Sequence, residues 1–353
     1  MHDRLHIGIN TLFLLPGEVG GTEVYLRGML PPLLANPDLR LTLFTNRENH
    51  DSFDGLERVL VPVEARHRPR RILAEQIRLP RLVKQAECAV LWNPGYTAPF
   101  FAPCPQVTTI HDCQWRTVPE GFSWGERRAH DLLVGLAAKR ADRIATVSEF
   151  SRAEIVRELG LTAERVSVTL EGWDPAFAEP SPSPFEAPYF LCVSNTYPHK
   201  NAGRLVEAFA AVADALPHAL VLVGQPGKGE PPPHPRVIRR HRLAFAELAG
   251  AMQHADALFM PSLYEGFGLP VLEGMAAGVP VFASRSGSIP EVGGEAIRYF
   301  DGTDTTSIAE AFRTAANDAS RTEFIARGKE RAAEFSWKAS AERLLKSLRE
   351  AAG

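Results

Sequence analysis

The sequence predicts an α/β fold with two doubly wound parallel sheets, each in a domain of its own. The length of 353 residues exceeds what one hydrophobic core usually spans. Short apolar runs alternate with segments of helical periodicity, and a proline-rich stretch near the middle interrupts the alternation. Alternating strands and helices are typical of parallel sheets covered by helices on both faces.

The first half of the chain begins with the apolar run 5–10, a glycine-rich loop and a helical pattern from Thr22. Further apolar runs predict strands at 39–45, 89–92, 106–110, 143–147 and 166–170. Between them, helical periodicity predicts helices at 71–84, 124–139 and 149–159.

Residues 178–188 read AEPSPSPFEAP, with four prolines in eleven residues, and we interpret them as a linker because proline continues neither helices nor central strands. The pattern then restarts, with strands at 189–193, 219–224, 257–261 and 279–284 and helices at 203–215, 245–254, 270–277, 305–317, 321–335 and 337–351. We therefore expect domains at 1–177 and 189–335 and a final helical segment at 336–353.

Composition and charge narrow the class of protein. A net charge of -3 lacks the basic excess of a nucleic-acid binder, so no nucleic-acid partner is expected. The four cysteines show no paired spacing and are typical of reduced, buried side chains. The N-terminus has no signal-peptide pattern, and no run approaches the ~20 apolar residues that cross a bilayer. We expect a cytoplasmic protein whose membrane contact, if any, is peripheral.

The segment after the predicted strand at 257–260 carries the strongest functional signal, because open parallel sheets bind ligands at the carboxyl ends of their strands. Glu265 is followed by Gly266 and Gly268, which allow close backbone approach to a ligand, and by a helix from about Leu269. The N-terminus of that helix suits a diphosphate. Glu273 lies one turn inside, about 6 Å along the axis. A carboxylate can hold sugar or ribose hydroxyls.

The run E-G-F-G-L-P-V-L-E at 265–273 resembles the signature of glycosyltransferase family 4. The resemblance implies the GT-B architecture, with two Rossmann-like domains facing a central cleft and a final helix that crosses back to the first domain. One departure is Gly274, where alanine is commoner and glycine costs about 1 kcal/mol of helix propensity. By resemblance, Glu265 contacts the donor sugar, Glu273 binds the ribose, and the amides of Gly266, Phe267, Gly268 and Leu269 hold sugar and phosphates.

Three further segments resemble the same family in the same order. Ser194-Asn-Thr-Tyr-Pro-His-Lys-Asn201 resembles its lysine–asparagine element, which assigns Lys200 to the leaving diphosphate and Asn201 to the donor site. Many members have an arginine shortly before it; serine and asparagine stand there instead, as in a mannosyltransferase-like subgroup. His111-Asp112 resembles the element whose histidine bonds the donor sugar, and the aspartate either orients the histidine or caps the next segment.

Gly20-Gly21 resembles the N-terminal glycine loop that faces the phosphates or the acceptor. The resemblance implies retaining transfer of a hexose from a nucleotide diphosphate sugar, with GDP-mannose as the first guess and a UDP-sugar as the alternative. The expected acceptor is a saccharide or lipid-linked saccharide in cell-surface polysaccharide or glycan synthesis. No Asp-x-Asp follows a strand, so neither a metal nor another cofactor is expected.

Two alternative functions remain open, as does the role of one basic segment. A non-hydrolysing sugar-nucleotide epimerase shares two Rossmann-like domains, and a non-catalytic carbohydrate-binding module of the same fold is a second reading. A nicotinamide dehydrogenase is disfavoured because the G-x-G-x-x-G fingerprint is missing. The region Arg66–Lys84 holds seven cations on a partly apolar helix. It is either a contact for an anionic membrane or a lipid diphosphate acceptor, or a solvated face.

Overall fold

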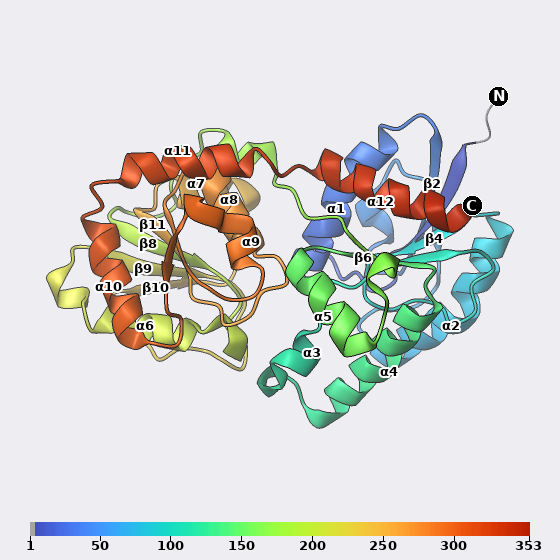
Figure 1. The fold of residues 1–353 in the computed structure, drawn as a ribbon, viewed down its shortest axis with the longest axis horizontal. Coiled ribbons are helices and arrows are strands. Elements are labelled where there is room, and N and C mark those ends of the chain that lie inside the picture. The colour runs from blue at the N-terminus through green and yellow to red at the C-terminus, as the bar shows by residue number, and fades with distance from the viewer. Residues whose placement is uncertain (1–3) are drawn as a thin grey trace. The chain divides into compact units, whose positions relative to one another are not determined.

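The computed structural model describes residues 4–353, which divide into two compact α/β units. Unit 1 contains residues 4–116 together with 124–171 and 337–353, and unit 2 contains 117–123 and 172–336. Each unit is a parallel sheet with helices on its faces, the fold class that the sequence predicts (Figure 1). The proline-rich stretch 178–188 lies within unit 2.

The described residues of unit 1 form a parallel sheet of seven strands in the order β3-β2-β1-β4-β5-β6-β7. Ile7 of β1 pairs with Leu41 of β2 on one side and Val90 of β4 on the other. The strand order reverses at β1 and β4, so the loops after these strands diverge and leave a crevice between them. The strands are β1 (Leu5–Asn10), β2 (Leu39–Thr45), β3 (Arg58–Leu60), β4 (Val90–Asn93), β5 (Gln106–Thr109), β6 (Arg143–Thr146) and β7 (Val166–Val168).

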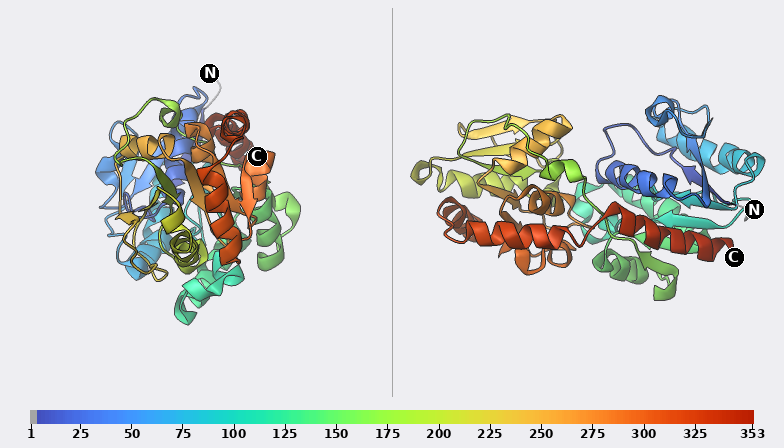
Figure 2. Two further views of the ribbon diagram at one scale, coloured as in Figure 1. Left: turned by 90° about the vertical axis from the view of Figure 1, so that its left-hand side faces the viewer. Right: turned by 90° about the horizontal axis from the view of Figure 1, so that it is seen from above.

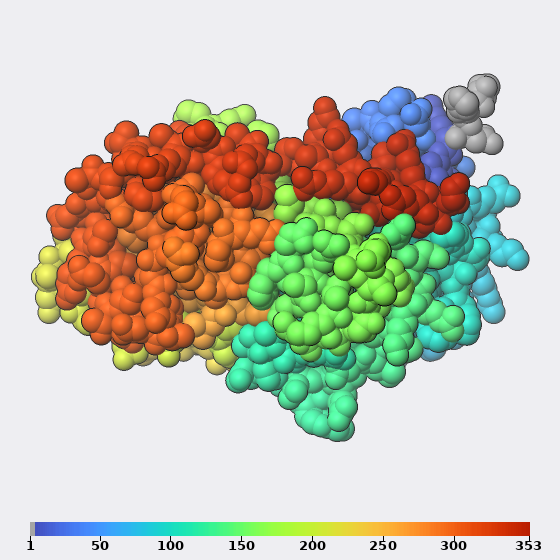
Figure 3. Space-filling model, in the orientation of Figure 1, coloured from blue at the N-terminus to red at the C-terminus, as the bar shows by residue number. Residues whose placement is uncertain are grey.

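The helices of unit 1 cover both faces of its sheet. They are α1 (Gly21–Leu34), α2 (Arg68–Gln85), α3 (Gln114–Thr117, which ends in unit 2), α4 (Trp124–Arg140), α5 (Glu149–Leu159) and α12 (Trp337–Ala352). The C-terminal helix α12 runs beside α1 (Figure 2). Trp337 packs edge-on against Tyr25 with ring centroids 6.3 Å apart, and Gly28 leaves room for its indole. The outer face of α12 remains exposed (red, Figure 3).

The described residues of unit 2 form a parallel sheet of six strands in the order β10-β9-β8-β11-β12-β13, which reverses at β8 and β11. The strands are β8 (Tyr189–Val193), β9 (Ala219–Val223), β10 (Val237–Arg240), β11 (Ala257–Met260), β12 (Val281–Ser284) and β13 (Arg298–Phe300). The helices are α6 (Ala202–Ala210), α7 (Phe245–Gln253), α8 (Leu269–Ala277), α9 (Ile289–Gly293), α10 (Thr305–Ala316) and α11 (Arg321–Ala332). The helix expected at 203–215 ends at Ala210 and is followed by a single 3-10 turn at Ala213–Ala215.

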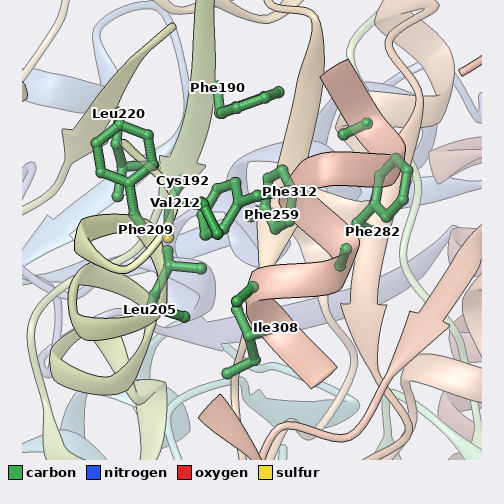
Figure 4. Close-up of a cluster of buried hydrophobic side chains, with 14 of the residues drawn as sticks. Phe190, Cys192, Leu205, Phe209, Val212, Leu220, Phe259, Phe282, Ile308 and Phe312 are labelled. Atoms are coloured by element: carbon green, nitrogen blue, oxygen red, sulfur yellow. The ribbon is translucent and has the colours of Figure 1, made fainter. Parts of the chain in front are cut away.

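Buried phenylalanines join the sheet of unit 2 to α6 and α10 (Figure 4). Phe259 of β11 stacks on Phe312 of α10 with ring centroids 4.1 Å apart, and Phe190 of β8 lies edge-on to Phe259. Such pairs add roughly 0.5–1.5 kcal/mol beyond the area they bury. This core holds β8 and β11 rigidly, and both strands carry the functional loops.

Gly274 is required by packing, which corrects the view that it only weakens α8. A Cβ at this position would lie 2.6 Å from Leu258 Cδ2 and 3.1 Å from Val281 Cγ2, side chains of β11 and β12. Gly274→Ala is therefore expected to destabilise the protein by about 1–3 kcal/mol instead of stabilising it.

Denaturant unfolding checks this expectation, with Gly135→Ala in α4 as the matched control. No atom lies within 4 Å of a Cβ built on Gly135, so alanine there is expected to add up to about 1 kcal/mol. Equal stabilisation by both substitutions would contradict the packing argument.

No helix among residues 4–353 has the length and apolar character needed to cross a membrane.

Candidate functional site

Lys200 and Glu265 meet where the strand order of unit 2 reverses. Lys200 ends the 3-10 turn Pro198–Lys200 that follows β8, and Glu265 lies in the loop after β11. The Lys200 ammonium donates to both carboxylate oxygens of Glu265, at 2.7 and 2.9 Å. Glu265 is only 7% exposed, and the Lys200 ammonium supplies the opposite charge beside it. The structure thus brings together two residues that the sequence assigned to separate parts of the donor.

Asn201 fixes the turn that presents Lys200. Its backbone adopts the left-handed conformation with φ of 58°, which asparagine tolerates better than most residues. Its amide nitrogen donates to the carbonyls of Pro261 (3.1 Å) and Gly302 (2.7 Å), and its amide oxygen accepts from Arg204 at 3.1 Å. The side chain therefore ties the turn to the end of β11 and holds Lys200 in place.

The loop from Glu265 to Leu269 is held from the side by Ser288. The Ser288 hydroxyl lies 2.7 Å from the carbonyl oxygen of Phe267 and 3.1 Å from that of Glu265. Gly268 caps the N-terminus of α8 with φ of 98°, a conformation that favours glycine. Gly266 precedes it in the same loop. The first turn of α8 thus lies beside Glu265 and presents its N-terminal dipole to this loop.

Glu273 lies one turn inside α8, and its carboxylate has no hydrogen-bond partner among residues 4–353. Although its side chain is partly accessible, surrounding protein raises its pKa to about 7, and the charge of Asp174 adds to the shift. A carboxylate held without a partner can accept hydrogen bonds from a ligand.

In unit 1, His111 follows β5 and is almost fully buried. Its Nε2 lies 3.0 Å from the carbonyl oxygen of Pro94, which only accepts, so the proton sits on Nε2. Burial lowers the pKa of His111 to about 4, which keeps the imidazole neutral near pH 7. Nδ1 has no hydrogen-bond partner in the described part of the chain and can accept from a hydroxyl.

Two tyrosines enclose His111, and sequence reasoning missed both. The ring of Tyr25 lies perpendicular to the imidazole at 5.0 Å, and the ring of Tyr96 lies 5.2 Å away. Tyr96 has a φ of 67°, which is uncommon for an aromatic residue and concentrates at functional sites. Asp112 accepts from the Gln114 amide at 3.1 Å and bonds the Tyr96 hydroxyl, so it serves as a cap and also fixes Tyr96.

Acid should weaken the fold through His111. Its pKa is about 4 in the folded protein and near 6.5 when unfolded, so the unfolded chain takes up the proton first as pH falls. The contribution of neutral His111 to the free energy of unfolding is fully present above pH 6.5 and is lost progressively between pH 6.5 and 4. Between pH 7 and pH 5, protonation of this histidine in the unfolded chain should lower the free energy of unfolding by about 2 kcal/mol.

Denaturant unfolding at pH 7 and pH 5 checks the contribution of His111. His111→Gln should lose about 2 kcal/mol less than the parent protein between the two pH values, whereas His241→Gln, at an exposed position, is the matched control and should lose as much as the parent. Equal losses in all three proteins would rule out the assigned neutral state.

The remaining predicted residues lie elsewhere in unit 1. Gly20 has φ of 59° and precedes α1, whose first residue is Gly21. In the basic region, Arg66 pairs with Glu18, Arg71 with Glu75, and Arg78 donates to the Pro62 carbonyl. Leu73 and Ile77 on the same helix are exposed. Membrane contact through this region stays a prediction.

Within residues 4–353, no three His, Cys, Asp or Glu side chains are grouped in a way that could hold a metal ion.

Two family descriptions match the two halves of the chain. Glycosyltransferase Family 4 matches residues 19–177, and Glycosyl transferases group 1 matches residues 187–318. O-antigen chain mannosyltransferase B of Escherichia coli is 31% identical over 253 residues, which are 65% of this chain and 66% of that protein. The MMP alpha-(1->4)-mannosyltransferase of Mycolicibacterium hassiacum is 31% identical over 168 residues, 44% of this chain and 40% of that protein. The chain thus spans at most about two thirds of these relatives.

Solved structures share the fold at low sequence identity. Sucrose-phosphate synthase from Thermosynechococcus elongatus superposes with a TM-score of 0.79 at 18% identity, covering 98% of this chain and 99% of that one. HepE of Anabaena, solved with UDP and glucose, has a TM-score of 0.74 at 19% identity, with 98% and 99% covered. The lipopolysaccharide glycosyltransferase WaaG has a TM-score of 0.75 at 16% identity, with 97% and 99% covered. Taken together, the two matched regions and the GT-B fold show that this chain belongs to the family 4 glycosyltransferases.

Proposed function

We propose that the protein is a retaining glycosyltransferase that moves a hexose from a nucleotide diphosphate sugar to a saccharide or lipid-linked saccharide in cell-surface glycan synthesis. The observation that carries the proposal is the Lys200–Glu265 pair at the strand reversal of unit 2, with the N-terminus of α8 beside it. A cation, a helix N-terminus and a carboxylate in one loop cluster match the charges and hydroxyls of such a donor.

Each member of the cluster has a distinct part in this proposal. The donor diphosphate takes hydrogen bonds from Lys200 and from the Leu269 amide at the N-terminus of α8, since Pro270 has no N–H and the Val271 amide donates to the Gly268 carbonyl. This frees the oxygens of Glu265 to accept from sugar hydroxyls. As the glycosidic bond breaks, the same cation and dipole stabilise the charge that develops on the leaving phosphate. The leaving phosphate accepts the proton of the attacking hydroxyl, so the sugar is transferred on the same face without a protein nucleophile.

Glu273 completes donor recognition within unit 2, where its unpartnered carboxylate accepts from the two ribose hydroxyls. Within unit 1, the open Nδ1 of neutral His111 can accept from a sugar hydroxyl. Since Lys200 and α8 supply positive charge for the diphosphate, transfer should proceed in the presence of EDTA. The mannosyltransferases among the relatives support GDP-mannose as the donor, with a UDP-sugar as the alternative.

A donor screen tests the proposal. The protein is mixed with GDP-mannose and a set of UDP-sugars, and its melting temperature is measured; a ligand at 100 times its Kd adds about 2.7 kcal/mol. One nucleotide sugar should raise the melting temperature clearly, and Glu273→Ala should abolish the shift. Proton NMR of the transferred sugar then reports its anomeric configuration. No shift with any nucleotide sugar would contradict the donor site, and an inverted product would contradict retention.

A further inference from the structure

Unit 1 contains a cavity of about 520 Å³ at the crevice where its strand order reverses. The loop after β1 contributes Phe13, the first turn of α1 contributes Thr22, and the loop after β4 contributes Tyr96 and Thr97. The first turn of α2 and the middle of α4 close the other sides. A cavity of this size and position is typical of a small-molecule site.

The charged groups of this cavity are all basic. Arg68 and Arg71 line it, and none of the lining residues is an aspartate or glutamate. Arg68 and Arg71 stand in the first turn of α2, which contains no acidic residue and has no side-chain cap. The helix dipole adds positive potential at the same place. The cavity therefore favours an anionic ligand.

Arg71 has unused hydrogen-bonding capacity. Its side chain is 13% exposed, and its guanidinium makes one long hydrogen bond, 3.5 Å to the Thr97 hydroxyl, besides an ion pair with Glu75 at 3.8 Å. A guanidinium has five N–H donors that fit phosphate oxygens in pairs. Glu75 lies outside the lining and is held by Thr97 and Asn10, so it leaves the cavity side of Arg71 open.

The rest of the lining is mainly apolar and aromatic. Phe13, Leu15 and Leu133 provide apolar wall beside Tyr96 and Thr97, whose hydroxyls bond Asp112 and Glu75. The ring of Tyr96 also contacts His111, the residue proposed to bind the donor sugar. The cavity is thus next to the donor sugar's proposed partner in unit 1, where an acceptor hydroxyl has to be placed.

We infer that this cavity binds the acceptor and that the acceptor carries a phosphate group held by Arg68 and Arg71. The inference rests on the proposed function, since it names the second substrate of the same reaction. The phosphate can belong to a lipid-linked saccharide or to a soluble sugar phosphate. Both sources present the same oxygens to the two guanidinium groups.

Calorimetric titration tests the inference with three probes: mannose 6-phosphate, N-acetylglucosamine linked to farnesyl diphosphate, and methyl mannoside as the neutral comparison. At least one phosphate-bearing probe should bind the parent protein more tightly than methyl mannoside. Arg71→Gln and Arg68→Gln should each weaken that binding by tenfold or more. Arg81→Gln is the matched control, because Arg81 is exposed on the same helix and does not line the cavity. Arg71→Lys keeps a charge beside Glu75 and replaces Arg71→Gln if the latter fails to fold.

The outcomes separate this inference from the proposed function. Tighter binding of only the farnesyl-linked or only the soluble probe supports the inference and identifies the source of the phosphate. The inference is overturned if neither phosphate-bearing probe binds more tightly than methyl mannoside, or if Arg81→Gln weakens binding as much as Arg71→Gln. Glu273→Ala should lose nucleotide-sugar binding and keep phosphate-probe binding. Loss of both would place the probe in the donor site and overturn the inference, whereas a parent protein that binds no nucleotide sugar contradicts the proposed function instead.

Discussion

Replacing Lys200 by methionine is expected to lower kcat/KM by about 10²–10³, equivalent to roughly 3–4 kcal/mol of transition-state stabilisation. Methionine keeps the length of the side chain and removes the cation that the leaving diphosphate needs. Initial rates of sugar transfer from the donor found in the screen measure the effect. Lys346→Met, on the exposed face of α12, is the matched control and should leave the rate unchanged.

The Lys200–Glu265 pair makes a second variant necessary. Lys200→Met leaves the buried carboxylate of Glu265 without its partner, which costs about 3–5 kcal/mol in comparable cases. The double variant Lys200→Met/Glu265→Gln removes both charges and should recover most of the stability without recovering activity. A double variant that regained parental rates would show that the pair only supports the fold.

The sequence could predict where these two residues lie but not that they touch. The pattern of strand followed by loop placed Lys200 after β8 and Glu265 after β11. Both positions were expected to be functional because open parallel sheets bind ligands at the carboxyl ends of their strands. Their pairing depends on β8 lying directly beside β11, across 65 residues of sequence. No local pattern encodes that adjacency. The sequence likewise does not encode that Asp174 lies close enough to Glu273 for its charge to raise the pKa of that carboxyl.

The strands that sequence reasoning missed share a physical property. The strands β3 (58–60), β10 (237–240) and β13 (298–300) are edge strands of three or four residues, and most of their side chains are only partly buried. Their apolar signal is therefore weak. Tyr96 was missed for a different reason: its left-handed backbone and its contact with His111 arise from tertiary packing. Gly274 was misjudged because helix propensity does not report the close approach of β11.

The affinity for the nucleotide sugar should fall about 100-fold between pH 8 and pH 5, and Glu273 is the cause. Its pKa of about 7 in the free protein lies above the ordinary value of 4.5, so the carboxyl is protonated over most of this range. Only the carboxylate accepts from both ribose hydroxyls, so binding must expel the proton, and the apparent Kd rises about tenfold per pH unit below 7.

Calorimetric titration at pH 8, 7, 6 and 5 measures how the apparent Kd of the nucleotide sugar changes with pH. A nucleotide sugar is used because the terminal phosphate of a free nucleoside diphosphate itself titrates at pH ~6. His111 stays largely neutral at pH 5, since its pKa is about 4, and so contributes little. Glu273→Gln should bind weakly at every pH with no slope. A parent protein whose affinity is flat from pH 8 to pH 5, or a glutamine variant that keeps the slope, would show that the ribose is held by other groups.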